Sequence, residues 1–129
     1  MRLLAGLFLI ATPAVSQGVP APEYFVATAM QTSTAQILAV NCATLSIDPG
    51  AMALLTDRTL RQLSEDGFSP ETLAEQMEDP SEAIAVLQDA FVARHDLAED
   101  VDEAKICAAG RSEISEATPI GALLLEVEG

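Results

Sequence analysis

The sequence predicts an all-α protein: a small bundle of about five to six helices, closed by one disulfide and preceded by a signal peptide. Half of the 129 residues are apolar, but only 4% are aromatic and none is Trp, so the core must be built from aliphatic side chains, which suit packed helices. Apolar residues recur at helical spacing between proline and glycine breaks. Two cysteines, Cys42 and Cys107, offer one pair for a disulfide.

Residues 1–16 have the features of a cleaved signal peptide. Arg2 gives a positive start, and residues 3–11 form an unbroken apolar run that is too short to span a bilayer. Pro13 and small side chains follow, and we expect cleavage after Ser16. The mature protein is therefore expected in the periplasm.

The rest of the chain has room for one domain. We expect residues 17–22 to form a flexible lead-in and residues 23–129 to form a single helical domain. The 20 acidic and 6 basic residues give a net charge of -14, which repels nucleic acid and anionic lipid surfaces. We therefore expect no nucleic acid partner and no stable membrane insertion after signal cleavage, whereas another periplasmic protein is a candidate partner.

The order of apolar, capping and breaking residues predicts each helix in turn. Leu38, Cys42 and Leu45 share one face of a long first helix, so the cysteine should point into the core. Asp48 is placed to cap the second helix, which should end at Gly67. The predicted helices cover residues 23–45, 49–66, 70–79, 81–95, 103–117 and 120–127, with a solvated acidic connector at residues 96–102.

Cys42 and Cys107 are far apart in the sequence and do not form a C-x-x-C redox or zinc motif. In an oxidising compartment we expect them to form a structural disulfide that joins the first helix to the fifth.

Three polar residues are candidates for a functional or structural role. His95, the only histidine, lies near the end of the fourth helix, where it could either interact with the helix dipole or bind a ligand. Arg111 is one of few cations and lies close in sequence to Glu113. We favour a buried structural ion pair for Arg111, and a ligand-binding arginine is the alternative.

No motif for catalysis, a metal or a cofactor stands out. No serine lies in a nucleophile elbow, no glycine-rich phosphate loop is present, and one histidine without a free cysteine cannot supply the usual zinc ligands. We therefore predict no catalytic residue, no metal and no cofactor. A non-catalytic binding or accessory module is the favoured function, and a small periplasmic enzyme of unknown reaction is the alternative.

Several features of the chain occur together in one known group of proteins. They are the signal peptide, Cys42, the turn Gly67-Phe68-Ser69, and the pattern Cys107, Gly110-Arg111, Glu113-Ile114, Ile120-Gly121 and Leu123-Leu124. By these features the chain resembles a family of small exported alphaproteobacterial proteins of unknown function, and the resemblance covers most of the mature chain and is most specific toward its end. The resemblance implies the architecture and the compartment. Some members are labelled as associated with the respiratory NADH dehydrogenase, which implies at most an accessory role here, because two cysteines are too few for an iron–sulfur cluster.

Overall fold

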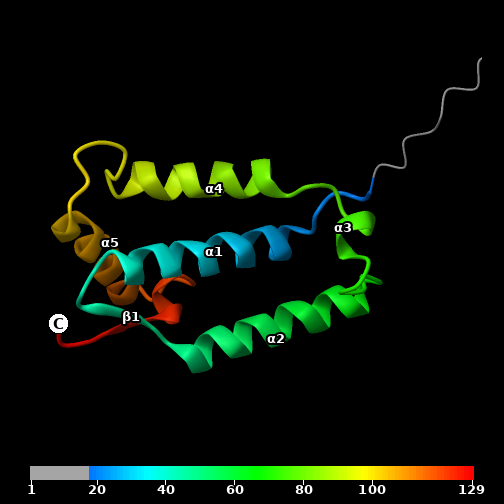
Figure 1. Cartoon of the computed structure of the whole chain (residues 1–129), viewed down its shortest axis with the longest axis horizontal. Helices are drawn as coiled ribbons and strands as arrows, with labels where there is room; N and C mark the ends of the chain where they lie inside the picture. Colours follow the sequence, from blue (N-terminus) through cyan, green and yellow to red (C-terminus); the bar gives the residue numbers. More distant parts are fainter. Residues whose placement is uncertain (1–17) are drawn as a thin grey trace, which may run out of the picture.

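Helices account for most of the computed structural model, which describes residues 18–129 (Figure 1). The mainly helical class and the disulfide predicted from the sequence are confirmed. The predicted signal peptide lies outside the described residues. The elements are α1 (Glu23–Val40), β1 (Leu45–Ile47), α2 (Pro49–Glu65), α3 (Leu73–Gln76), α4 (Ser81–Arg94), α5 (Glu103–Ser115), the 3-10 helix η1 (Gly121–Leu123) and β2 (Leu124–Glu126).

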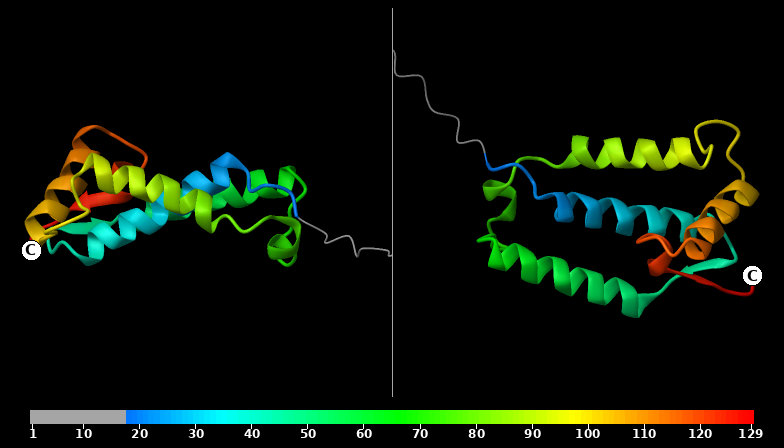
Figure 2. Two further views of the ribbon diagram at one scale, coloured as in Figure 1. Left: turned by 90° about the horizontal axis from the view of Figure 1, so that it is seen from above. Right: turned by 180° about the vertical axis from the view of Figure 1, so that it is seen from behind.

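Helix α1 runs through the middle of the molecule, with α4 along one side and α2 along the other (Figures 1 and 2). The short α3 connects α2 to α4 at one end, while α5, η1 and the two strands gather at the opposite end (Figure 1). The buried core lies at this second end. Leu38 of α1, Phe91 of α4, Leu45 of β1 and Leu123 of η1 belong to one buried cluster there.

The prediction that the first helix continues to residue 45 is wrong. Helix α1 ends at Val40, and the side-chain amide of Asn41 donates a hydrogen bond to the carbonyl of Ile37 at 2.8 Å. Leu45–Ile47 instead forms a strand. An asparagine can satisfy a helix-end carbonyl with its own side chain, and this competition with the backbone ladder favours ending the helix.

The predicted terminal helix at residues 120–127 is also wrong. Only Gly121–Leu123 is helical, and Leu124–Glu126 pairs antiparallel with β1, with Ile47 opposite Leu124. The backbone N–H of Asp48 donates to the carbonyl of Leu123 at 2.8 Å. Backbone N–H and C=O groups of the two segments therefore form hydrogen bonds with each other across the sheet. The two segments are distant in the sequence, so helical periodicity cannot reveal this pairing.

Both predicted caps of α2 are confirmed. The carboxylate of Asp48 accepts hydrogen bonds from the N–H groups of Gly50 at 3.0 Å and Ala51 at 3.1 Å, and Pro49 is the first helical residue. Gly67 follows the helix with a φ of 89°, the left-handed conformation that glycine adopts without strain.

The disulfide joins Cys42 to Cys107, with 5.3 Å between the Cα atoms. Cys107 lies on α5 as predicted, but Cys42 lies just beyond α1 because that helix is shorter than expected. Both residues belong to the buried core. The bridge therefore fastens the α1–β1 connection to α5 within the buried core.

Two glycines let α5 approach its neighbours. A Cβ atom on Gly110 would lie 2.3 Å from Leu45 Cδ1, and one on Gly121 would lie 2.0 Å from the carbonyl oxygen of Glu113. A side chain at either position would therefore clash with a neighbouring segment, so both glycines permit close packing. Among the described residues, no helix combines the length and apolar character needed to cross a membrane.

Candidate functional site

Glu113 is the one charged residue among the buried residues that the structure describes, and it is 0% exposed. Helix α5 carries it inward, toward the end of α4 and the turn that precedes η1. Its Oε1 atom accepts hydrogen bonds from Arg94 Nη2 and from His95 Nε2, the latter at 2.7 Å. Its Oε2 atom accepts a hydrogen bond from the hydroxyl of Thr118. We call these four residues the Glu113 cluster.

The surroundings of Glu113 keep it ionised. Burial alone would raise the pKa of its carboxyl group, because a charge is costly away from water. The hydrogen bonds from Thr118, His95 and Arg94, together with the positive charge of Arg94, outweigh burial and hold the pKa below the ordinary value of 4.5. The carboxylate thus ties α4 to α5 and to the turn before η1.

His95 and Arg94 pack on an aromatic ring at the end of α4. The His95 ring lies 4.6 Å from the ring of Phe91, and the Arg94 guanidinium carbon lies 5.4 Å from that ring's centre. The His95 side chain is 10% exposed and that of Arg94 is 57% exposed. The sequence left two roles open for His95, and the structure places it against a buried carboxylate at the helix end.

The expectation of a buried ion pair at Arg111 is wrong. Arg111 is exposed and forms no ion pair with the residues that the structure describes. Residues two apart on a helix point to different sides, so Arg111 and Glu113 cannot meet. Arg94, 19 residues away in the sequence, takes the position beside Glu113. No local pattern could have identified this partner, because it depends on how α4 packs beside α5.

A surface hollow of about 360 Å³ borders the Glu113 cluster. Arg94, His95, Lys105 and Asp96 are among the residues that line it. Lys105 Nζ lies 3.9 Å from Asp96 Oδ2. A buried carboxylate that holds an imidazole at the rim of a hollow can orient that ring for proton transfer. The lining of this hollow includes no serine, threonine or cysteine that the imidazole could activate.

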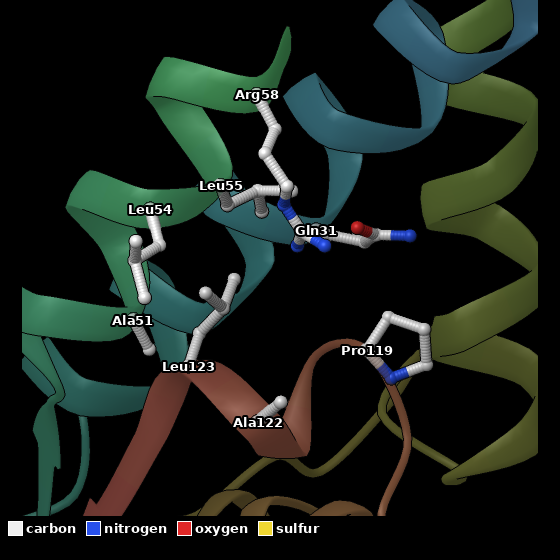
Figure 3. A pocket seen from close by; sticks show the side chains of 8 residues that line it. All are labelled: Gln31, Ala51, Leu54, Leu55, Arg58, Pro119, Ala122 and Leu123. Atoms are coloured by element: carbon white, nitrogen blue, oxygen red, sulfur yellow. The ribbon is translucent and has the colours of Figure 1, made fainter.

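A second, larger opening lies between α1, α2 and η1 and has a volume of about 450 Å³ (Figure 3). We call it the α1–α2–η1 pocket. Its lining residues are Gln31 of α1, Ala51, Leu54, Leu55 and Arg58 of α2, Pro119, and Ala122 and Leu123 of the η1 segment.

The pocket combines apolar and polar lining residues. In Figure 3 the side chains of Arg58 and Gln31 extend toward the middle of the opening, while Leu54, Leu123 and Pro119 lie around it. The volume lies within the range of about 300–1,000 Å³ that is typical of small-molecule sites. Sequence reasoning missed this site, because its residues come from three segments that carry no shared motif.

The comparisons with known proteins give a family but no function. The search of curated proteins found no match, and the search of solved structures found none either. The sequence model of a family described as "Family of unknown function (DUF5333)" matches residues 17–125, and the chain therefore belongs to this family.

Proposed function

We propose that the mature chain is a periplasmic, non-catalytic binding module that holds its ligand in the α1–α2–η1 pocket. The observation that carries this proposal is the character of the pocket: it is open to solvent, mostly apolar, and contains an arginine that forms no ion pair with the described residues. An opening with apolar walls and a few polar groups is the usual form of a binding site.

The Glu113 cluster supports a structural role rather than catalysis. A carboxylate that acts directly on a substrate must reach it, whereas Glu113 is fully buried and both of its oxygen atoms accept hydrogen bonds from neighbouring side chains. The cluster joins α4, α5 and the segment before η1. It therefore stabilises the scaffold that supports Leu123 and Ala122 on one side of the pocket.

Two observations support export. The disulfide between Cys42 and Cys107 is of the kind that persists in an oxidising compartment. The family match begins at residue 17, which is the residue that follows the expected cleavage point. An accessory role beside the respiratory NADH dehydrogenase, which the sequence resemblance implies, is compatible with an exported binding module.

Cell fractionation tests the compartment. We expect the protein in the periplasmic fraction, with a mass that corresponds to removal of residues 1–16 and with no thiol that reacts with a maleimide. Detection of the intact chain in the cytosol, with two reactive thiols, would contradict the proposed location.

A neutral apolar dye tests the pocket. N-phenylnaphthylamine should gain fluorescence with the wild-type protein, and Ala122→Trp should abolish the gain by filling the opening. Ala53→Trp is the matched control, because Ala53 is an exposed alanine of α2 that does not line the pocket. Equal dye binding by all three proteins would show that the pocket is not the binding site.

The alternative, a small periplasmic enzyme, has one observation in its favour. His95 lines the hollow beside Arg94 and Lys105 while Glu113 holds its ring from the other side. Our proposal expects His95→Ala to lower the unfolding midpoint, because the substitution removes a donor from a buried carboxylate. Loss of a cellular phenotype with an unchanged unfolding midpoint would favour the enzyme instead.

A further inference from the structure

We infer that the ligand of the α1–α2–η1 pocket is an aliphatic carboxylate, with its anionic group on Arg58 and its hydrocarbon chain along the apolar wall. This inference rests on the proposed function and names its ligand class. It follows from the positive charge of Arg58, from the planar shape of its guanidinium group and from the apolar residues in the rest of the lining.

Arg58 is the group that favours an anion. Arg94 and Lys105, which line the other hollow, each lie beside an acidic side chain, whereas Arg58 has no ion-pair partner among residues 18–129. Arg61 and Arg111 form no ion pair with the described residues either, but neither lines one of these two openings. The whole chain has a net charge of -14, so an anion is repelled at most of the surface. An unpaired guanidinium in the lining of a pocket is therefore an exception on this protein, and it is complementary to one negative charge.

The chemistry of Arg58 favours a carboxylate over a neutral polar group. A guanidinium donates two parallel hydrogen bonds to the two oxygen atoms of a carboxylate, and such charge-assisted pairs are stronger than neutral hydrogen bonds. Gln31 also lines the pocket, and its side-chain amide can donate a further hydrogen bond. One cation with one amide suits a single carboxylate better than a group with several charges.

The rest of the lining favours a hydrocarbon chain. Leu54 and Leu55 of α2, together with Ala122 and Leu123 of the η1 segment, form an apolar part of the lining (Figure 3). Leu54 is 66% exposed, so its side chain is accessible to a ligand in the pocket. A chain that lies between these side chains would remove apolar surface from water on both sides.

Competition with the bound dye tests the ligand class. Decanoate, decanol and decyltrimethylammonium have the same chain and carry a negative, no and a positive charge. We expect decanoate to displace N-phenylnaphthylamine at about one-tenth of the concentration that decanol needs, and the cationic compound to be the weakest. Each pair of methylene groups between hexanoate and decanoate should strengthen binding about tenfold.

Variants test the position of the carboxylate. Arg58→Ala should weaken decanoate binding about tenfold and leave decanol binding unchanged. Arg58→Lys should retain part of the preference for decanoate over decanol. Arg61→Ala is the matched control, because Arg61 is exposed on the same helix and does not line the pocket. Circular dichroism with urea should show that all three variants unfold at the wild-type midpoint.

The outcomes separate the two proposals. The carboxylate inference is overturned, and the binding module stands, in either of two cases. In the first, the dye binds in the pocket but decanoate and decanol displace it equally. In the second, Arg58→Ala changes the binding of neither decanoate nor decanol. If the dye does not bind, or if Ala122→Trp does not affect its binding, the proposed function itself fails. Dimerisation that the Ala122→Trp substitution abolishes would overturn the inference in favour of a second copy as the occupant.

Discussion

Substitution of Glu113 by alanine should lower the free energy of unfolding by about 3 kcal/mol. Removing one member of a buried ion pair typically costs about 3–5 kcal/mol, because the remaining groups lose their partner. The lower end applies here, because the Arg94 side chain is 57% exposed and can recover hydrogen bonds with water. His95 is only 10% exposed, so its unpaired nitrogen contributes most of the loss.

Urea unfolding followed by circular dichroism measures this loss. Glu116→Ala is the matched control, because Glu116 is an exposed glutamate next to α5 that has no ion pair with the described residues. We expect the control to change the free energy of unfolding by less than about 0.5 kcal/mol. A loss below about 1 kcal/mol for Glu113→Ala would refute the reasoning, since it would mean that the cluster does not connect the helices.

The effect should depend on pH with a defined sign. Folding lowers the pKa of Glu113 below its ordinary value of 4.5, so its ionised form stabilises the folded state above that pH. This stabilisation is lost as the pH falls through the folded-state pKa. The difference between wild type and Glu113→Gln should therefore be largest at neutral pH and should shrink below pH 4.5. A difference that does not change with pH would contradict the assignment.

Three further predictions concern other parts of the fold, and urea unfolding tests each of them. Replacing both Cys42 and Cys107 by serine, or adding a reductant, should lower the free energy of unfolding by about 4 kcal/mol, because the bridge closes a loop with a sequence separation of 65. An unchanged midpoint would count against this. Gly121→Ala should cost about 3 kcal/mol or more, since its Cβ would lie 2.0 Å from a backbone oxygen, whereas Gly50→Ala has 3.4 Å to its nearest neighbour and should cost nothing. Equal effects would exclude the steric reason. Asp48→Ala should cost about 1 kcal/mol through loss of the cap of α2, and a neutral result would refute that role.

Local signals located the start of α2 correctly but did not locate every helix. Asp48 and Pro49 mark the start of α2 as predicted, whereas Asp102, which was assigned to the acidic connector, caps α5 by accepting a hydrogen bond from the N–H of Lys105 at 2.9 Å. These signals work because capping depends on residues within one turn of each other. The disulfide was predictable for a different reason, since two cysteines allow only one pairing within the chain.

Contacts between distant segments were not predictable in the same way. The β1–β2 pair forms because residues 45–47 and 124–126 meet in space, and neither segment is long enough to show strand alternation. The partner of Glu113 was misassigned for the same reason, since Arg111 is near in sequence but Arg94 is near in space. The α1–α2–η1 pocket likewise exists only once three segments have packed.

A crystal structure of the mature protein grown with decanoate would examine the ligand assignment at atomic level. The account predicts a carboxylate within hydrogen-bond distance of Arg58 and an alkyl chain between Leu55 and Leu123. Decanoate bound elsewhere on the protein, or bound in the pocket with its carboxylate directed away from Arg58 into solvent, would contradict it.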